Sequence, residues 1–518
     1  MKFPDISLIS LTHLKKPRTI EVDYEAKTFR KDGQPFKYVA GELHYFRIPR
    51  AYWKDRLRKA RYCGLNAIST YVEWSSHETL GGLPAWMLTG NPDMQLRTAD
   101  PPFLSFVDRW FRVLFEKITP LLYGKGGPIF MVQVENEYGN YFQCDQEYLR
   151  WLSEKMSSYV GKNAVLYTTD QATDSAFKCG PAPGALATVD FGAGNDVDAL
   201  FDFMSYRNKG GPLVNSEFYS GWLTHWTENF GGEATGAVVK TMIDILQRNA
   251  SFTIYMIHGG TNFGFTSGSK PPGNFIRRER NIGGFSKMTT LFLQLGLRLH
   301  KGKDPMDYPK KAYGSIKLSA VVSIFDAPDI YDDEPVYEKI PQSFETLEIY
   351  SGYVLYETYI PKKFPDFASL SNLKIRDRAI VYLDEELRAI FNRSSDHYSL
   401  TLLQTDRGKK LSIFIENQGY INYEKHMQGD FKVGVDYACQ YGCHASSFQH
   451  PCERFGVVFV NGKNMGRYWP SVGPQITLYI PGCYLKAYPG INKLVILEEE
   501  IVPETLEMKF QDRHRVRG

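Results

Sequence analysis

Residues 124–140 read GKGGPIFMVQVENEYGN and bring strand-forming residues and carboxylates together in one place. Glycines and Pro128 form a turn before the apolar run 129–134, whose length and β-branched character are typical of a strand buried on both faces. The run ends in Glu135 and Glu137. Carboxylates at the end of such a strand lie where parallel α/β folds keep their chemistry. Alternatively, these are surface carboxylates at a solvated strand end. Features elsewhere in the sequence are needed to choose between a functional site and a surface position.

A strand, a helix and a second strand precede this run. Residues 36–42 and 66–71 have the composition of strands, and residues 50–63 have helical spacing with their apolar side chains on one stripe. This order indicates two parallel strands of one sheet. The same alternation recurs further along, with predicted helices at 103–123, 146–160 and 234–248 and predicted strands at 164–169, 188–191, 213–217 and 252–258.

The sheet therefore has seven predicted strands, one fewer than a closed (β/α)8 barrel contains. The gap can be located, because there is no room for a helix and a strand between Glu78 and the segment GGLPAW at residues 81–86. We predict an α/β fold, a (β/α)8 TIM-type barrel whose third βα unit is missing. Such a barrel leaves two strand edges unpaired.

Beyond the barrel strands the pattern changes. Residues 285–300 have helical spacing and would end the barrel near residue 305. Short alternating runs separated by turns follow, which is typical of antiparallel β-sandwich domains of the jelly-roll type. The runs are 312–318, 353–360, 379–383, 411–415, 455–460, 475–480 and 493–498, and Asn461-Gly462 is a hairpin signal. We predict a catalytic barrel domain at 1–305 and C-terminal β-sandwich domains at 306–518, approximately 306–435 and 453–518.

Charge and composition argue against several classes of protein. The chain carries 61 Lys and Arg against 58 Asp and Glu without a basic block, so neither nucleic acid nor an anionic membrane is expected as a partner. No run reaches the ~18 apolar residues of a membrane span. Residues 1–19 lack the apolar region of a signal peptide, which taken alone predicts a cytosolic chain. Aromatic residues at 14% suit stacking on sugar rings, although stiff β-rich cores use them too.

A second carboxylate candidate is Glu217, in the segment GPLVNSEFY at residues 211–219, again at the end of an apolar strand. Glycoside hydrolysis needs two such carboxyls: a protonated one donates to the leaving oxygen, and an ionised one attacks or activates water. Asn136 beside Glu137 would hold the acid in place or bind a substrate hydroxyl. Aromatic residues at or after strand ends offer stacking platforms, namely Tyr71, Trp74, Tyr138, Tyr219, Trp222 and Trp226.

Other kinds of site have weaker support. Asp170 and Asp190 also end strands and are alternative acids. No HExxH, P-loop or dinucleotide fingerprint occurs, and Ser216 lacks the glycines of a nucleophile elbow. One cluster of possible zinc ligands occurs, but its spacing fits no standard zinc site. It contains Cys439, Cys443, His444, His450 and Cys452. We therefore expect no metal and no other cofactor.

The segment 126–139 resembles the signature of the glycoside hydrolase family 35 β-galactosidases. The resemblance spans almost the whole chain. It also covers GQPFKYVAGELHYFRIPR (33–50), GLNAISTYVEW (64–74), GGLPAW (81–86), NSEFYSGW (215–222), GGTNF (259–263) and NGKNMGRYWP (461–470).

This resemblance implies a retaining exo-β-galactosidase that removes terminal non-reducing β-D-galactose from glycoconjugates. Glu137 would be the acid/base, and Glu217 would be the nucleophile that forms a covalent glycosyl-enzyme intermediate. The substrate contacts carried over by motif would be Tyr71, Glu135, Asn136 and Tyr219, with Trp222 as a stacking residue.

The resemblance also bears on compartment and assembly. Cys144 and Cys179 flank the motif-rich region and resemble a disulfide of the animal members, which favours the lysosome, vacuole or secretory pathway over the cytosol. In those compartments the sequons at Asn249 and Asn392 would be acceptors for glycans. A homodimer stays open as an assembly.

The chain also departs from the family pattern. The family carries a βα unit of roughly 30–40 residues before GGLPAW, whose strand lines the galactose pocket, and this chain lacks it. The loop after Gly264 differs, and a Cys-rich tract at 438–452 replaces a longer β segment. Two rival interpretations therefore stay open: a carbohydrate-binding homologue with impaired catalysis, and a barrel glycosidase for another β-linked sugar.

Overall fold

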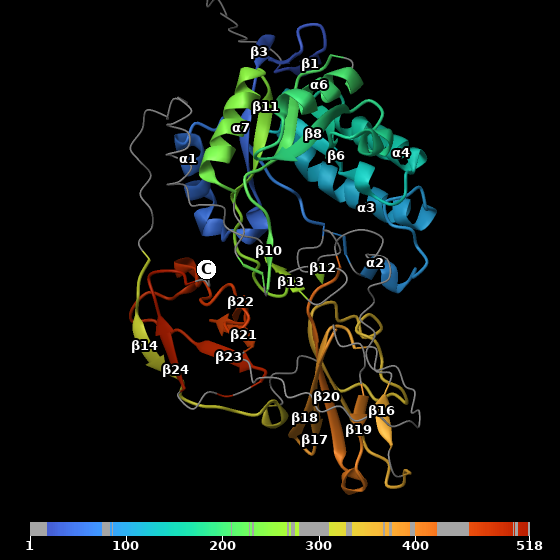
Figure 1. Cartoon of the computed structure of the whole chain (residues 1–518), viewed down its shortest axis with the longest axis vertical. Helices are drawn as coiled ribbons and strands as arrows, with labels where there is room; N and C mark the ends of the chain where they lie inside the picture. Colours follow the sequence, from blue (N-terminus) through green and yellow to red (C-terminus); the bar gives the residue numbers. More distant parts are fainter. Residues whose placement is uncertain are drawn as a thin grey trace, which may run out of the picture.

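The computed structural model describes residues 18–74, 83–84, 86–208, 210–226, 228–229, 233–266, 269–270, 275–278, 310–327, 334–365, 368–371, 375–393, 399–421, 455–500, 502 and 506–515. A curled parallel sheet with helices forms one part of the molecule, and antiparallel sheets form the rest (Figure 1). The predicted fold class is thereby confirmed. The division near residue 305 stays a prediction, because that position and the predicted helix at 285–300 lie outside the described residues.

All seven predicted barrel strands are present in one sheet. Every neighbouring pair in it is parallel, so the carboxyl ends of the strands, including the residues that follow them, lie at one end of the sheet. The spatial order is β5 (Ala67–Ser69), β4 (Val39–Leu43), β11 (Ser251–His258), β9 (Val214–Tyr219), β8 (Leu186–Gly192), β7 (Val165–Gln171) and β6 (Met131–Asn136).

The sheet does not close into a complete barrel. β5 and β6 are its two ends, and within the described residues neither strand pairs with the other. β8, in the interior, is buried along nearly its whole length, whereas β6 is only half-buried at most positions. The open side lies between the two strands that flank the missing βα unit in the sequence, as predicted.

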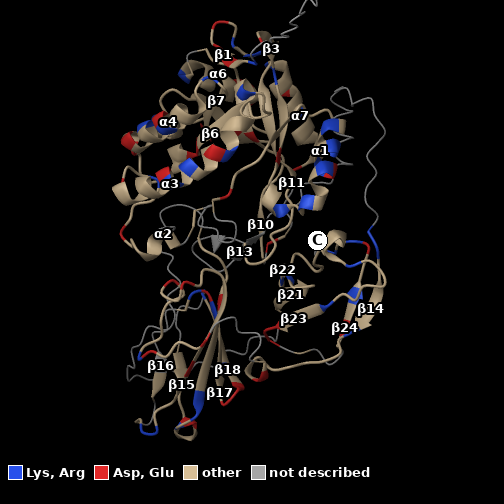
Figure 2. Cartoon of the chain, turned by 180° about the vertical axis from the view of Figure 1, so that it is seen from behind, with Lys and Arg blue, Asp and Glu red and all other residues tan. Residues whose placement is uncertain are grey.

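Helices pack against the sheet, and charged residues are spread along them (Figure 2). Four of them were predicted: α1 (Trp53–Tyr62), α3 (Pro101–Ile118), α4 (Gln146–Val160) and α7 (Thr235–Gln247). The predicted end of α3 at residue 123 was wrong, because Pro120 lacks the amide hydrogen that would continue the helix. Three further helices were not predicted: α2 (Trp86–Thr89), α5 (Asp174–Cys179) and α6 (Val197–Arg207).

Small antiparallel sheets complete this part of the chain. One precedes the barrel strands and contains β1 (Ile20–Asp23), β2 (Thr28–Lys31) and β3 (Gln34–Phe36). Another follows β9 and contains β10 (Thr224–His225), β13 (Phe275–Arg278) and β12 (Ser269–Lys270). Described helices of this or any other part of the chain do not combine the length and apolar content that a membrane crossing requires.

Two main antiparallel sheets follow. The first contains β15 (Gly352–Tyr359), β20 (Lys410–Asn417), β17 (Arg378–Leu383) and β18 (Glu386–Asn392). The second contains β22 (Lys463–Tyr468), β21 (Gly456–Val460) and β23 (Leu494–Glu498). Two strand pairs lie beside them, namely β14 (Gly314–Lys317) with β24 (Glu507–Phe510) and β16 (Ser369–Ser371) with β19 (Ser399–Thr401).

The hairpin prediction was confirmed and one strand prediction was wrong. Asn461 and Gly462 join β21 to β22 with φ values of 52° and 77°, as a type I′ turn requires. Residues 475–480 form no strand. The backbone N–H of Ile476 donates to the carbonyl of Arg515 instead of joining a ladder, and proline residues bound the segment on both sides.

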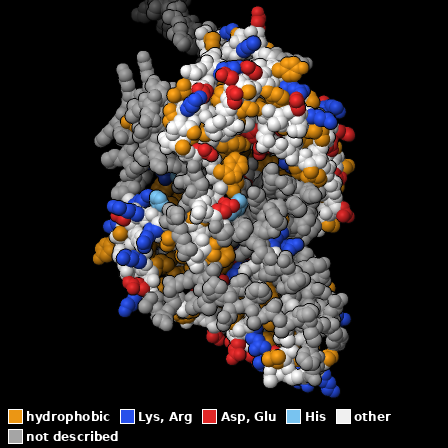
Figure 3. Space-filling view, viewed as in Figure 1, with side chains coloured by type: hydrophobic (Ala, Val, Ile, Leu, Met, Phe, Trp, Pro, Cys, Tyr) orange, Lys and Arg blue, Asp and Glu red, His pale blue; other side chains and the backbone are white. Residues whose placement is uncertain are grey.

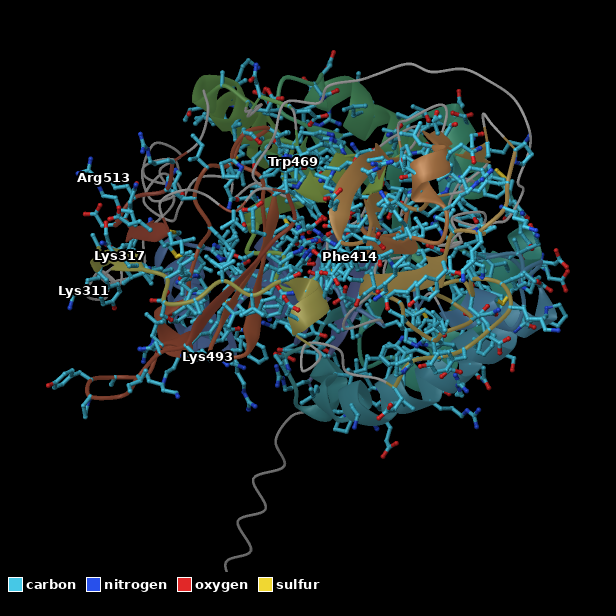
Figure 4. The ribbon with its side chains drawn as sticks, turned by 90° about the horizontal axis from the view of Figure 1, so that it is seen from below. Lys311, Lys317, Phe414, Trp469, Lys493 and Arg513 are labelled. Carbon is cyan, nitrogen blue, oxygen red and sulfur yellow. A yellow bond between two sulfur atoms is a disulfide. The ribbon has the colours of Figure 1, made fainter. Side chains whose placement is uncertain are left out.

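A hollow of about 4050 Å³ lies between the parallel sheet and the antiparallel sheets. Figure 4 shows three of its basic lining residues, Lys311, Lys317 and Arg513, at one rim and Phe414 near the centre. Lys and Arg side chains gather over β14 and β24 (Figure 3). The sequence does not reveal this basic surface because two segments almost 200 residues apart supply it. Neither Glu137 nor Glu217 lines the hollow.

Candidate active site

Glu217 is buried near the end of β9, and two tyrosines hold its carboxyl group. Tyr71 follows β5, and its hydroxyl donates a hydrogen bond to Oε1 of Glu217. The Tyr219 hydroxyl donates to Oε2 at 3.2 Å. Only 6% of Glu217 is exposed. The carboxyl group is therefore fixed in orientation by contacts to both of its oxygen atoms.

Glu137 directly follows β6. Its backbone is left-handed, with φ 47° and ψ 38°, and its N–H donates to the carbonyl of Thr169 on β7 at 2.8 Å. A left-handed conformation is unfavourable for a residue with a Cβ atom and persists only where surrounding contacts impose it. Here the turn carries the Glu137 side chain off the strand, at the same end of the sheet as Glu217.

Asn136 connects the two glutamates. Its Nδ2 reaches Glu137 Oε2 at 3.5 Å, and its Oδ1 lies 3.3 Å from the Tyr71 hydroxyl, which donates to Glu217. The Gln133 amide donates to the same Oδ1 at 2.8 Å and thereby orients the Asn136 side chain. The structure thus brings together Tyr71, Asn136, Glu137, Glu217 and Tyr219, five of the predicted site residues.

Burial and the closeness of other acids raise pKa values at this site. Burial, opposed by the hydrogen bond from Tyr71, raises the pKa of Glu217 to about 8, and the nearby charge of Glu137 adds to the increase. Burial, with contributions from Glu137 and Glu217, raises the pKa of Asp190 to about 9. Adjacent carboxyls that influence each other in this way titrate as a group. Buried carboxyl groups of this site therefore retain protons at neutral pH.

Glu135 points into a different environment. Its carboxylate accepts two hydrogen bonds from the Arg97 guanidinium, at 3.0 and 2.9 Å, one from the Tyr148 hydroxyl at 2.9 Å and one from the Asn136 N–H at 2.8 Å. Arg97 also donates to the Asn136 carbonyl at 2.7 Å. Both carboxylate oxygens thus already have protein partners. That Glu135 contacts substrate stays a prediction, and its contacts here support the loop that carries Glu137.

Of the six predicted stacking aromatics, Tyr71 and Tyr219 hold Glu217, and the other four differ in exposure. Tyr138 and Trp226 are buried, with 0% and 3% exposed, and Trp74 stacks on Trp110 with ring centroids 5.5 Å apart, so these three pack the interior or the rim. Trp222 is 61% exposed and lies edge-on to Tyr219, with their centroids 5.2 Å apart. Trp222 is consequently the member of the set that is most accessible to a sugar ring.

The two alternative acids have different surroundings. Asp170 accepts a hydrogen bond of 2.8 Å from the N–H of Gly139, in the turn after Glu137, and its pKa rises to about 7 mainly because it is buried. A Cβ at Gly180 would lie 1.9 Å from this carboxyl, so the site has no space for a substrate there. Asp170 braces the turn, whereas Asp190 lies next to Glu137 and Tyr219.

Several residues of the site were not predicted. Arg97, Gln133 and Tyr148 hold Glu135 and Asn136, and Tyr255 lies beside Tyr71 and Tyr219 with centroid distances of 6.3 and 6.1 Å. The only signal for Arg97 was indirect: a buried carboxylate needs a cation, but nothing in the sequence indicates which one.

The predicted disulfide between Cys144 and Cys179 is present. It ties the start of α4 to the end of α5, close to the turn after Glu137. The weakly supported zinc group at residues 439–452 lies outside the described residues. Among the residues that the structure does describe, no three His, Cys, Asp or Glu side chains are arranged to hold a metal ion.

Comparisons with known proteins give a consistent result. The family described as "Glycosyl hydrolases family 35" matches residues 28–80 and 78–278 in two segments, which meet where the βα unit is missing. "Beta-galactosidase, first all-beta domain" matches residues 341–438, and "Beta-galactosidase, galactose-binding domain" matches residues 454–492.

Curated relatives align over nearly the whole chain. A Felis catus protein named beta-galactosidase is 33% identical over 96% of this chain and 92% of its own length. The Homo sapiens beta-galactosidase is 33% identical over 96% of this chain and 90% of its length. A Mus musculus beta-galactosidase-1-like protein is 32% identical over 96% of this chain and 92% of its own length. The cat alignment spans 619 positions against the 518 residues of this chain, so at least 101 positions lack a counterpart here.

Proposed function

The chain belongs to glycosyl hydrolases family 35, and from this premise we propose that it acts as a retaining exo-β-galactosidase. It is a glycoside hydrolase, and the proposal concerns its sugar, its stereochemistry and its point of attack. The substrate would be terminal non-reducing β-D-galactose on glycoconjugates, because curated relatives that align over nearly the whole chain are named beta-galactosidase.

In this proposal Glu137 donates a proton to the glycosidic oxygen while the carboxylate of Glu217 bonds to C1 and the C1–O bond breaks. The aglycone leaves as an alcohol, and galactose stays bound to Glu217 as an ester. Glu137, now a carboxylate, takes a proton from water as the water oxygen attacks C1 and Glu217 departs. The two displacements at C1 together retain its configuration.

One observation carries the proposal: two glutamates at the ends of different strands of one parallel sheet interact, Glu217 at a buried position and Glu137 at a half-buried one. The Glu137 charge raises the pKa of Glu217, and Asn136 contacts both Glu137 and the Tyr71 hydroxyl that holds Glu217. In the reaction, Tyr71 and Tyr219 would stabilise the charge on Glu217 before attack. Asn136 would be free to shift one hydrogen bond to a substrate hydroxyl.

The proposed compartment is the lysosome or secretory pathway. The Cys144–Cys179 disulfide is of a kind that persists in oxidising compartments. The resemblance of Cys144 and Cys179 to a disulfide of the animal family members favours the same assignment.

The test is hydrolysis of 4-nitrophenyl β-D-galactoside by the purified full chain, with the β-D-glucoside as comparison. Glu137→Gln should lower kcat/KM by at least about 100-fold, and Glu217→Gln should abolish turnover. Glu154→Gln, at an exposed position of α4, is a matched control that should leave activity unchanged. Proton NMR of the first-formed sugar should show the β anomer. Preference for glucoside, or full activity in either site variant, would refute the proposal.

A second candidate function is carbohydrate binding with impaired catalysis. The open side of the sheet between β5 and β6 favours it, because the strand missing there would adjoin the pocket in a complete barrel. In that case galactose would raise the melting temperature of the chain, while no galactoside would be hydrolysed. Hydrolysis that depends on Glu137 and Glu217 would exclude this candidate.

A further inference from the structure

Asp190 is a buried carboxyl group to which the proposed reaction gives no role. It lies on β8, directly opposite Glu217 in the parallel register with β9, and only 3% of it is exposed. Its Oδ2 lies 2.8 Å from the Tyr219 hydroxyl, and the same hydroxyl lies 3.2 Å from Glu217 Oε2. Tyr219 therefore stands between two carboxyl groups.

The proton on the Tyr219 hydroxyl cannot serve both neighbours fully. If Asp190 is ionised, two carboxylates compete for one proton, and the shorter contact favours Asp190 over Glu217. If Asp190 is protonated, its own O–H donates to the tyrosine oxygen. The tyrosine proton is then available to Glu217, and both short contacts become hydrogen bonds.

The surroundings of Asp190 favour the protonated form. The charged groups that act on it most strongly are acids, Glu137 after β6 and Glu217 on β9, and burial together with Glu137 raises its pKa to about 9. Its second oxygen, Oδ1, is buried and has no hydrogen-bond partner of ordinary geometry among the described residues. An ionised Asp190 would place a further charge at a buried position in contact with Glu137, which is unfavourable.

We propose that Asp190 is a positioning residue that stays protonated and directs the Tyr219 hydroxyl proton onto Glu217. The inference rests on the proposed role of Glu217 as nucleophile. It adds a residue that acts on Glu217 through Tyr219 and does not touch the sugar. In this arrangement Asp190 lets the tyrosine stabilise the ionised nucleophile and fixes one of its two oxygens.

The kinetic test compares Asp190→Asn, Asp190→Ala, Tyr219→Phe and the double variant Asp190→Ala/Tyr219→Phe. The Asn amide can donate to the tyrosine oxygen as the protonated acid does, so this variant should keep kcat within about fivefold of the wild type. Each of the other single variants should lose about 10- to 100-fold in kcat, as expected for a lost hydrogen bond to a charged group. The double variant should be no worse than either single variant, because both changes break the same chain of hydrogen bonds.

Two kinetic results would overturn the proposal. Equal losses in Asp190→Asn and Asp190→Ala would mean that the carboxylate charge is required. Multiplying losses in the double variant would mean that Asp190 and Tyr219 act independently.

A thermal measurement decides the protonation state without reference to activity. Because the folded pKa of Asp190 is raised, its stabilising protonated form is fully present below the unfolded value near 3.9 and is lost as pH rises. The melting temperature of Asp190→Asn minus that of the wild type should therefore increase from pH 4 to pH 8. A difference that stays flat or shrinks would show an ionised Asp190 and refute the proposal. A wild-type chain without turnover would instead refute the proposed function, and the thermal result would still stand.

Discussion

Replacing Arg97 by Met should destabilise the chain and misplace the acid. Arg97 supplies two of the four hydrogen bonds to Glu135 and one to the Asn136 carbonyl. Removing one partner of a buried ion pair typically costs about 3–5 kcal/mol, because the other charge stays buried and unpaired. Arg97 is 21% exposed, and Glu135 would keep its bonds from Tyr148 and Asn136, so we expect the lower end, about 3 kcal/mol. Loss of the contact to the Asn136 carbonyl should lower kcat by about tenfold.

Urea unfolding at pH 7, followed by tryptophan fluorescence, measures the stability change. Arg109→Met is the matched control, since Arg109 lies on exposed helix surface over the rings of Trp86 and Phe106, and it should cost less than about 1 kcal/mol. Adding Glu135→Gln to Arg97→Met should recover part of the loss, because the unpaired charge disappears. An Arg97→Met chain within 1 kcal/mol of wild type, or strictly additive losses in the double variant, would refute the reasoning.

Three further predictions concern the pH dependence of activity, the pH dependence of stability and the disulfide. Burial raises the pKa of Glu217 to about 8, and attack on C1 needs the ionised carboxylate, so kcat/KM should rise as pH increases towards about 8; a profile that stays flat from pH 5 to pH 8 would contradict this. Burial and the charge of Glu416 raise the pKa of Glu499, so the contribution of this group to folding stability is full in acid and declines as pH rises. Glu499→Gln should therefore raise the melting temperature more at pH 7 than at pH 4, as calorimetry can measure. The Cys144–Cys179 disulfide closes a loop with a sequence separation of 35. Removing it should lower the free energy of unfolding, measured by urea titration, by about 3–4 kcal/mol. An unchanged free energy of unfolding would contradict this prediction.

Local sequence signals were sufficient for most of the barrel part of the fold. α4 has the predicted bounds because Asp145 caps its first turn and Gly161 follows its last residue. The seven strands were predictable because strands buried on both faces are short, continuous apolar runs. The break between β5 and β6 was predictable because a helix and a strand need a minimum length of chain. The strand prediction at residues 475–480 was wrong because an alternating pattern shows that a strand could form but not that a partner strand lies beside it.

The site was only partly predictable, for a physical reason. Glu137 and Glu217 end apolar strands, so their proximity followed from the parallel topology. The contacts of Arg97 depend on a loop that brings together residues 38 positions apart, and no periodicity encodes that. The relation of Asp190 to Glu217 depends on the register of β8 against β9, which a shift of one residue would reverse.

The central claim is that Glu217 attacks the sugar, and trapping the covalent intermediate tests it most directly. A 2-deoxy-2-fluoro-β-galactoside with a good leaving group should inactivate the chain and leave one fluorinated sugar on the peptide that contains Glu217, as peptide mass spectrometry can show. Glu217→Gln should take up no label. A label on any other residue, or turnover of galactosides without any trapped sugar, would contradict the account.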